Sequence, residues 1–466
     1  MLQLRGMIAD MPRLHLSAGL LLVVALSAAP LLTAHIGPAA SQPPGPRVVA
    51  IGDVHGALDE LVEILQTAGL IDANRQWVGG TAVLVQTGDV FARGPKVRES
   101  LDLLMRLEEE AKRAGGRVEA LLGNHEVMDL LHDFRDDPPA TFASFADDKS
   151  EARRQRAFDD YARLVKRRAR PGEAAPVRET WLESHPRGFL EYVDALGPRG
   201  SYGRWLRSHK VVVTESGSAF MHAGIHPNLR GTFADINRTV TRELRAWDDT
   251  KAMMVQAQIV PAFCTLSEAV EGAAAELQRI SAALKTEQPP GDHVTQAFIG
   301  QLRALLAVDK WSLLDSEGPL WFRGFASWPE TPEIRDKQVT PLLTRFGVER
   351  FVTSHTPSRA GRIVSRFDNR LILIDTGMLT TFFQGGRASA LELQNGKITA
   401  IYTDSRTSIV PASAADFLRE VFPRTFAGAS LAIVWRGAQP RRPPRDTDRS
   451  RAQQKSVHVR DRSTTS

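Results

Sequence analysis

Residues 48–56 read VVAIGDVHG, a short apolar run followed directly by a polar, glycine-flanked turn. Four consecutive apolar residues are typical of a strand that is buried on both faces of a sheet. Helical spacing follows, because Leu58, Leu61 and Leu65 share one face of a helix expected over residues 58–70. This part of the sequence therefore predicts a strand, a turn and a helix in that order.

The same pattern occurs twice more along the chain. Apolar runs at 82–85 and 118–122 are each followed by a helical stretch, the first of which covers residues 97–114. Strands that alternate with helices predict an α/β fold with the strands buried in the middle. A hairpin is expected at 211–221, and then a run of antiparallel hairpins built from residues 351–353, 363–364, 371–374, 390–393 and 398–402.

Two polar, helical segments interrupt this sheet pattern, at about residues 133–198 and 238–314. We interpret them as helical inserts in one domain that spans residues 45–405. The basic runs at 153–156 and 166–170 are typical of solvated helix faces, and guidance of a substrate is the alternative. Residues 406–435 are expected to form a C-terminal extension.

The composition is that of a soluble globular protein, with 42% hydrophobic and 24% charged residues. The net charge of +5 comes from the last 31 residues, since residues 436–466 hold nine Lys or Arg and three Asp. That basic tail has almost nothing to bury, so we expect it to be disordered. It also lacks interleaved aromatic residues, so no nucleic-acid partner is expected.

The N-terminal segment, residues 1–44, is expected to be a signal peptide followed by a linker. Arg5 and Arg13 precede an apolar run at 16–32, and small residues follow through Ser41. An uncleaved membrane anchor is the alternative, and membrane contact is expected only in that case. The leader predicts a periplasmic or secreted protein. The single cysteine, Cys264, excludes an intrachain disulfide and a cysteine-rich metal site.

Polar side chains follow each of the first three predicted strands. Asp53 and His55 come after the first, Asp89 after the second, and Asn124 and His125 after the third. In open α/β sheets, ligands bind outside the carboxyl ends of the strands, so these turns are expected to converge.

Two later histidines end predicted strands in the same way. His222 follows residues 219–221, and His355 follows residues 351–353. Each alone is more typical of a core or loop histidine, but together they supply further nitrogen ligands. The candidate metal ligands are then Asp53, His55, Asp89, Asn124, His222 and His355. This mixture of nitrogen and oxygen without sulfur suits Mn, Fe or Zn better than Ca²⁺ or Mg²⁺.

The order of these motifs resembles that of the calcineurin-like metallophosphoesterases, and within them the phosphoprotein phosphatase branch. The motifs are Gly-Asp-x-His-Gly at 52–56, Gly-Asp-x-x-x-Arg-Gly at 88–94, Gly-Asn-His-Glu at 123–126, His-x-Gly at 222–224 and the late His355. Residues 318–324 and 374–378 are similar to the bacterial Shewanella-like protein phosphatases. The resemblance covers about residues 47–403 and implies a metallophosphoesterase-type β-sandwich flanked by helices.

The resemblance also implies roles for individual residues. Asp53, His55 and Asp89 would hold one metal ion, and Asp89, Asn124, His222 and His355 would hold a second, so that Asp89 bridges. His125 would act as the catalytic proton donor to the leaving group. The substrate-binding residues would be Arg93, Arg323 and Asn124. A pair of cations can activate a shared hydroxide and neutralise charge on a phosphoryl transition state.

One residue departs from the pattern. The family carries Asp directly before the motif arginine, where it is thought to orient the catalytic histidine, and this chain has Ala92. We therefore expect His125 to be a weaker acid, or to be held by another residue such as Glu126. Slow turnover, or a bias toward phenolic leaving groups, is the resulting hypothesis.

The sequence as a whole predicts a dinuclear metal-dependent phosphomonoesterase, in particular a phosphoprotein phosphatase. Its substrate would be a phosphorylated protein or a small phosphoester. A dinucleoside polyphosphate hydrolase, similar to the diadenosine tetraphosphatases, is the alternative within the same chemistry. A non-catalytic binder of phosphorylated ligands is the alternative from another class.

Overall fold

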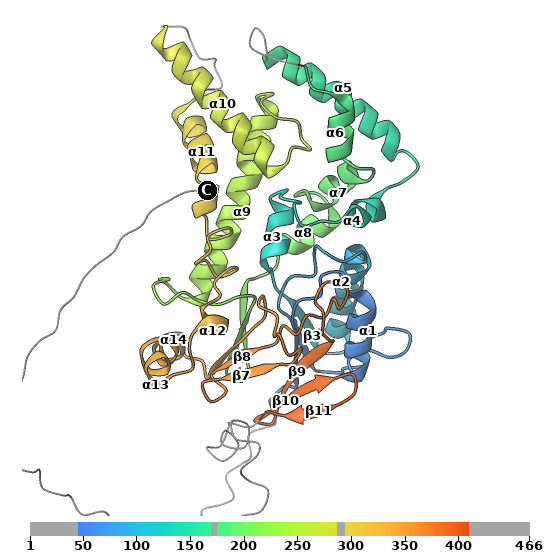
Figure 1. Ribbon diagram of the computed structural model, residues 1–466, viewed down its shortest axis with the longest axis vertical. Coiled ribbons are helices and arrows are strands. Elements are labelled where there is room, and N and C mark those ends of the chain that lie inside the picture. The colour runs from blue at the N-terminus through green and yellow to red at the C-terminus, as the bar shows by residue number, and fades with distance from the viewer. Residues whose placement is uncertain (1–44, 169–174, 287–293, 410–466) are drawn as a thin grey trace, which may run out of the picture. The chain divides into compact units, whose positions relative to one another are not determined.

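The computed structural model describes residues 45–168, 175–286 and 294–409. Two mixed β-sheets lie side by side in the lower part of Figure 1, below most of the inserted helices. The first sheet has six strands in the order β11-β10-β9-β1-β2-β3. Strands β1, β2 and β3 run parallel, while β9, β10 and β11 continue the sheet in antiparallel pairs. Its strands are β1 Val48–Ile51, β2 Val83–Gln86, β3 Arg117–Ala120, β9 Ser389–Gln394, β10 Lys397–Tyr402 and β11 Arg406–Ser408.

The second sheet has five strands in the order β4-β5-β6-β8-β7. They are β4 Val212–Glu215, β5 Ser218–Met221, β6 Arg350–Thr353, β7 Val364–Arg366 and β8 Leu371–Leu373. The predicted run of antiparallel hairpins is partly wrong here, because β6 lies between β5 and β8 and runs parallel to both. Only β7–β8 and β9–β10 are hairpins within that run, and they lie in different sheets.

The two sheets pack face to face through alternate residues of their strands. Val48 and Ala50 of β1 belong to a buried cluster that also contains Phe220 and Val352 of the second sheet. Val49 and Ile51 point to the other face and pack with the helices that follow the first strands. This alternation is the ordinary result of the two-residue period of a strand. The β-sandwich expected from the resemblance is thereby confirmed.

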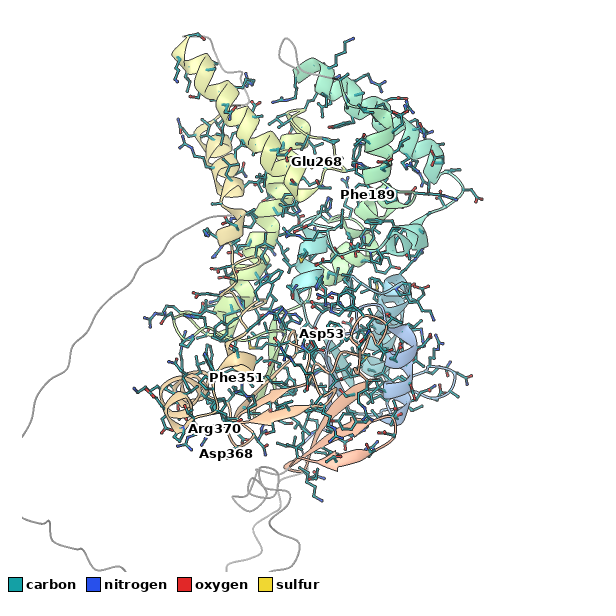
Figure 2. All side chains as sticks on the ribbon, viewed as in Figure 1. Asp53, Phe189, Glu268, Phe351, Asp368 and Arg370 are labelled. Carbon is teal, nitrogen blue, oxygen red and sulfur yellow. The ribbon has the colours of Figure 1, made fainter. Side chains whose placement is uncertain are left out.

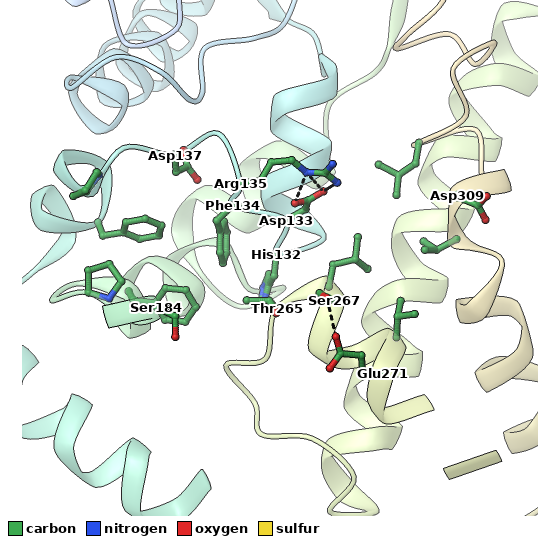
Figure 3. A pocket seen from close by; sticks show the side chains of 18 of the residues that line it. His132, Asp133, Phe134, Arg135, Asp137, Ser184, Thr265, Ser267, Glu271 and Asp309 are labelled. Atoms are coloured by element: carbon green, nitrogen blue, oxygen red, sulfur yellow. Dashed lines mark hydrogen bonds and ion pairs between the residues drawn. The ribbon is translucent and has the colours of Figure 1, made fainter. Parts of the chain in front are cut away.

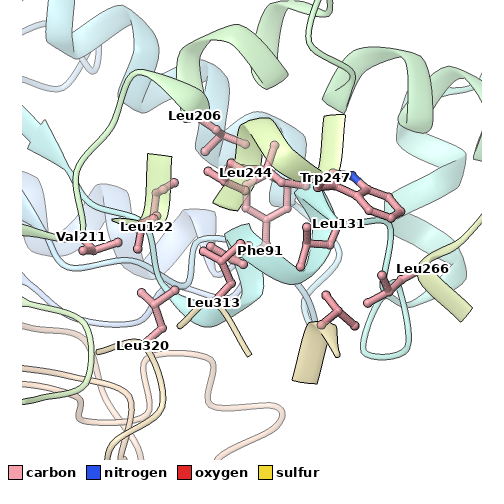
Figure 4. Packing of buried hydrophobic residues seen from close by; sticks show 14 of the residues in the cluster. Phe91, Leu122, Leu131, Leu206, Val211, Leu244, Trp247, Leu266, Leu313 and Leu320 are labelled. Atoms are coloured by element: carbon pink, nitrogen blue, oxygen red, sulfur yellow. The ribbon is translucent and has the colours of Figure 1, made fainter. Parts of the chain in front are cut away.

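Helices cover both outer faces of the sandwich. Helices α1 (Leu58–Thr67) and α2 (Val97–Arg113) pack on the first sheet, where their apolar residues join Val49 and Ile51. A larger cluster contains Met221 and Phe351 of the second sheet and joins them to several of the remaining helices. Figure 4 shows other members of this cluster, among them Phe91, Leu244 and Trp247. The fold is therefore a sandwich between two helical layers.

Most of the remaining helices stand where the sequence predicts the two inserts. The first group is α3 Asn124–Leu130, α4 Pro139–Phe145, α5 Ser150–Arg168, α6 Arg178–Ser184, α7 Phe189–Leu196 and α8 Ser201–Arg207. The second group is α9 Phe233–Gln256, α10 Leu266–Lys285, α11 Gln296–Leu306 and η1 Val308–Lys310. Shorter elements follow as α12 Gly324–Ser327, α13 Pro332–Ile334, η2 Arg335–Val339 and α14 Thr340–Phe346. The boundaries of the domain and its inserts stay a prediction.

The predicted leader at 1–44, most of the C-terminal extension at 406–435 and the basic tail at 436–466 lie outside the described residues. Within the described ranges, no helix combines the length and the apolar character that crossing a membrane requires.

Candidate metal centre

The three predicted turns meet at one edge of the first sheet. Asp53 and His55 follow β1, Asp89 follows β2, and Asn124 opens helix α3 directly after the turn that follows β3. Because these strands are parallel and adjacent, their carboxyl ends lie at the same edge. Figure 2 shows Asp53 at the end of the sandwich nearer to the inserted helices.

Backbone hydrogen bonds tie the first two turns together. The amides of Val54 and His55 both donate to the carbonyl of Asp89 at 2.9 Å, and the amide of Gly56 donates to the carbonyl of Val90 at 2.9 Å. Gly94 lies so close that a Cβ there would collide with the carbonyl oxygen of His55. This close approach explains why the motif needs glycine at position 94.

The second and third turns are joined by a buried carboxylate. Glu126 accepts hydrogen bonds from the amides of Asp89 (2.7 Å), Val90 (2.7 Å) and Gly123 (2.6 Å). Its carboxylate therefore holds the backbone of the site, and it does not orient the ring of His125. Burial raises the pKa of Glu126 to about 7.

The second sheet brings its two histidines to the same place. His222 follows β5 and His355 follows β6, and these strands are parallel neighbours. The amide of Ser354 donates to the carbonyl of His222 at 2.8 Å, which fixes the two strand ends side by side. The amide of His355 donates to Oδ1 of Asp53 at 3.1 Å, so the contact crosses from one sheet to the other.

The six predicted ligands form one buried cluster around Asp89. Nε2 of His222 lies 2.9 Å from Oδ1 of Asn124, 3.0 Å from Nδ1 of His355 and 3.3 Å from Oδ2 of Asp89. Nε2 of His55 lies 3.8 Å from a carboxylate oxygen of Asp53 and 3.8 Å from one of Asp89. Each of the six side chains is at most 5% exposed.

Two histidine rings are oriented by the backbone. Nδ1 of His55 donates to the carbonyl of Phe91 at 2.7 Å, and Nδ1 of His222 donates to the carbonyl of Thr87 at 3.0 Å. With Nδ1 held by the backbone, Nε2 of each ring is the nitrogen that faces the cluster, which is the arrangement of a metal-ligating histidine.

Burial and mutual charge shift the titration of the cluster. Burial lowers the pKa of His55 to about 4 and, with the charge of His222, that of His355 to about 2. Burial also acts to lower the pKa of His222, but the carboxylates of Asp89 and Asp53 outweigh it and raise this pKa to about 9. Burial opposes ionisation of Asp89, yet the neighbouring imidazoles hold its pKa well below the ordinary value.

The residues present fit a pair of metal ions. Two sets of ligand atoms, His55–Asp89–His125 and Asp89–His222–His355, each lie within 4.8 Å of one another and share Asp89. Nε2 of His355 is buried without a hydrogen-bond partner in the described part of the chain. Buried carboxylates packed against imidazole nitrogens are costly unless cations or hydrogen bonds compensate them. Carboxylate, amide and imidazole donors together suit a transition-metal ion.

The remaining predicted residues surround this cluster. His125 has Nε2 at 3.9 Å from a carboxylate oxygen of Asp89, and its ring meets that of His55 edge to face at 5.0 Å. Nη1 of Arg93 donates to Nε2 of His55 at 2.7 Å. The exposed Arg323 donates to the carbonyl of His355 at 3.0 Å, so its guanidinium lies beside the cluster. The roles of all these residues stay predictions.

One carboxyl group at the site was missed in the sequence. Asp375 is 1% exposed, and its Oδ2 has no hydrogen-bond partner among the described residues. Burial and the charge of Asp53 raise the pKa of Asp375 well above the ordinary value. The signal was present, since Asp375 follows the apolar run 371–374 just as Asp53 follows β1.

Left-handed backbone conformations gather at the site. Non-glycine residues with positive φ include His55 (49°), Asp89 (59°), Ala92 (65°), Arg93 (66°) and His355 (68°). Such conformations are uncommon for residues other than glycine and concentrate at functional sites, where the surrounding structure holds them in place.

Parts of this chain are similar to known phosphoesterases. Residues 46–244 match the model of the calcineurin-like phosphoesterase family. The chain is 47% identical to Shewanella-like protein phosphatase 2 of Arabidopsis thaliana over 89 residues, which are 19% of this chain and 23% of that protein. It is 28% identical to an uncharacterized protein of Schizosaccharomyces pombe over 368 residues, 78% of this chain and 82% of that protein.

The structure is similar to a solved structure, the cold-active protein-tyrosine phosphatase of a psychrophilic Shewanella species. The alignment covers 78% of this chain and 80% of the phosphatase chain. The identity is 23% and the TM-score 0.48. The matched segment 46–244 contains the turns after β1, β2 and β3 as well as His222. Residues 46–244 therefore match a calcineurin-like metallophosphoesterase domain.

Proposed function

We propose that this protein is a dinuclear metal-dependent phosphomonoesterase that acts on phosphorylated proteins. The observation that carries the proposal is the convergence of the six predicted ligands from five strand ends around Asp89, which lies within ligand distance of His55 on one side and of His222 and His355 on the other. One set would comprise Asp53, His55 and Asp89, and the other Asp89, Asn124, His222 and His355. When bound, the two cations activate water for attack on phosphorus and neutralise charge on the phosphoryl oxygens.

The chain's own residues would bind and orient the substrate. Arg93 and Arg323 lie beside the cluster and would donate hydrogen bonds to phosphoryl oxygens, as guanidinium groups do in many phosphate sites. His125 would give the proton on Nε2 to the leaving oxygen. We propose Mn, Fe or Zn as the native metals, because the donors mix nitrogen and oxygen.

A cleft next to the site supports a substrate larger than a free phosphate ester. Its volume is about 920 Å³, and it lies between residues 132–139 and residues 265–271 of the two inserts (Figure 3). Trp321 lines this cleft, and its indole meets the ring of His355 edge to face at 6.0 Å. A peptide chain in the cleft would therefore reach the ligand cluster at this tryptophan.

Phosphatase assays on purified protein test the proposal. We expect Mn²⁺-dependent release of phosphate from 4-nitrophenyl phosphate and from phosphopeptides, abolished by chelator and lowered at least about a hundredfold by Asp89→Asn. Asp368→Asn is the matched control, because Asp368 is exposed and its left-handed conformation (φ 56°) suits asparagine. Cleavage of dinucleoside tetraphosphates without phosphopeptide turnover would assign the alternative hydrolase, and metal binding without any turnover would assign a binder.

We further propose that the protein is exported, on the sequence of residues 1–44 alone. The test is to express the full chain in a Gram-negative host, separate the periplasmic, membrane and cytoplasmic fractions, and determine the N-terminus of the mature protein. Export predicts a periplasmic product whose N-terminus follows the small residues near Ser41. A full-length chain in the membrane fraction would support the anchor, and a full-length cytoplasmic chain would contradict both.

A further inference from the structure

His125 lacks the carboxylate that the calcineurin-like metallophosphoesterases supply from the residue directly before the arginine of the motif at 88–94, which is Arg93 here. That position is Ala92, a buried residue that is 1% exposed and has no hydrogen-bonding side chain. Glu126 follows His125 directly in the sequence, but its carboxylate already accepts hydrogen bonds from the backbone amides of Asp89, Val90 and Gly123. A proton donor without a partner on its second ring nitrogen is free to adopt the wrong tautomer or rotamer.

Another carboxylate lies on the Nδ1 side of the His125 ring. Oδ2 of Asp136 is 3.8 Å from Nδ1 of His125, while the acid nearest to Nε2, at 3.9 Å, is Asp89. The two nitrogens of His125 thus face two different carboxylates, one at the ligand cluster and one away from it. The separation of 3.8 Å is longer than a hydrogen bond, but contacts of catalytic groups often shorten only once substrate is bound.

The backbone places Asp136 beside the altered motif. The amide of Arg93, directly after Ala92, donates to the carbonyl of Asp136 at 3.1 Å. Arg135, the cation next to Asp136 in sequence, is held by the carboxylate of Asp133 through its Nε at 2.8 and 2.9 Å. The side chain of Asp136 is 44% exposed, so it can rotate toward the ring without disturbing the core.

We infer that Asp136 is the positioning residue for His125 and takes the place of the carboxylate that Ala92 lacks. Asp136 accepts a hydrogen bond from Nδ1–H, and this contact keeps Nε2 directed at the leaving oxygen. The ring acts in its doubly protonated form: the proton on Nε2 passes to that oxygen as the bond from phosphorus to oxygen breaks, and the proton that stays on Nδ1 leaves the neutral Nδ1–H tautomer held by Asp136. The inference rests on the proposed phosphatase function, and it predicts no bias toward phenolic leaving groups.

The kinetic test compares substrates that differ in their need for a proton. We expect Asp136→Ala to lower kcat on a phosphoserine peptide by about ten- to a hundredfold, and on 4-nitrophenyl phosphate by less than about threefold, because nitrophenolate leaves with little protonation. Adding Ala92→Asp to this variant should restore most of the loss, since aspartate tolerates the left-handed backbone at this position. Asp148→Ala, at an exposed aspartate of the same insert, is the control and should change neither rate.

Equal losses on both substrates, no loss on either, or no recovery with Ala92→Asp would each overturn the inference. A second readout does not depend on turnover. Nitrogen-15 NMR of the His125 ring in metal-free protein near neutral pH should show the Nδ1–H tautomer in the wild type and a mixture in Asp136→Ala. An unchanged tautomer would overturn the inference. If the wild type hydrolyses no phosphate ester, the proposed function fails, and the NMR result still decides whether Asp136 orients the ring.

Discussion

Individual carboxyl groups in and near this site differ in how their surroundings shift their pKa values. Against the effect of burial, neighbouring imidazoles hold the pKa of Asp89 below its ordinary value, whereas burial raises the pKa of Asp137, in the segment that leads away from His125. Burial raises the pKa of Asp137 to about 7, and the pKa of its neighbour Asp129 is raised well above the ordinary value for the same reason. The hydroxyl of Tyr192 donates to the buried Asp129 at 2.8 Å, and Asp137 lines the cleft.

This difference gives a pH dependence with a defined sign. Because the pKa of Asp137 is higher in the folded chain than in the unfolded chain, the free energy of unfolding falls as pH rises from about 4 to about 7. Asp137→Asn replaces the carboxyl group with an amide that does not ionise. The free energy of unfolding of the variant should therefore rise relative to that of the wild type across that window. The gain has an upper bound of about 4 kcal/mol.

Urea denaturation at pH 5 and pH 8 and at one fixed Mn²⁺ concentration measures this gain. Subtracting the free energy of unfolding of the wild type from that of the variant at each pH cancels the contribution of metal binding. Asp148→Asn is the control, because that side chain is exposed. A constant difference between wild type and Asp137→Asn at both pH values would contradict the assignment.

At the scale of loops and strands, the site depends on how closely the turns after β1 and β2 approach. Gly94 contacts the backbone of His55 and Gly56, and a side chain there must push the two turns apart. We expect Gly94→Ala to cost about 1–3 kcal/mol of stability and to abolish phosphatase activity. Gly300→Ala is the control, because Gly300 lies in α11 and a Cβ added there would meet open space. This variant should gain about 1 kcal/mol of stability.

Thermal unfolding and turnover measured on both variants check this pair of expectations. Wild-type stability and turnover in Gly94→Ala would show that the turns do not need their present separation.

The sequence predicts the elements of this site better than their arrangement in the sheets. Apolar runs mark the strands, and the Asn395-Gly396 turn of β9–β10 has positive φ at both residues, as an Asn-Gly hairpin requires. The parallel pairing of β6 was missed, because the three-residue run 351–353 does not record which strands lie beside it. Asp136 was missed for a related reason, since its contact with His125 depends on the path of the loop after α3.

At the scale of the whole molecule, the predicted ligands of the candidate centre come from both sheets. Asp53, His55, Asp89 and Asn124 follow strands of the first sheet, and His222 and His355 follow strands of the second. Burial of Val48 and Ala50 against Phe220 and Val352 fixes the sheets face to face, so the two sets of ligands meet without a flexible linker. Sequence spacing alone could not reveal this, since Asp53 and His355 are 302 residues apart.

Anomalous diffraction from crystals grown with Mn²⁺ is the most direct test that these residues hold two cations. We expect two peaks about 3.5–4 Å apart, with the carboxylate of Asp89 in contact with both. Asn124, His222 and His355 should surround one peak, and Asp53 and His55 the other. A single peak, or peaks that none of these side chains contacts, would contradict it.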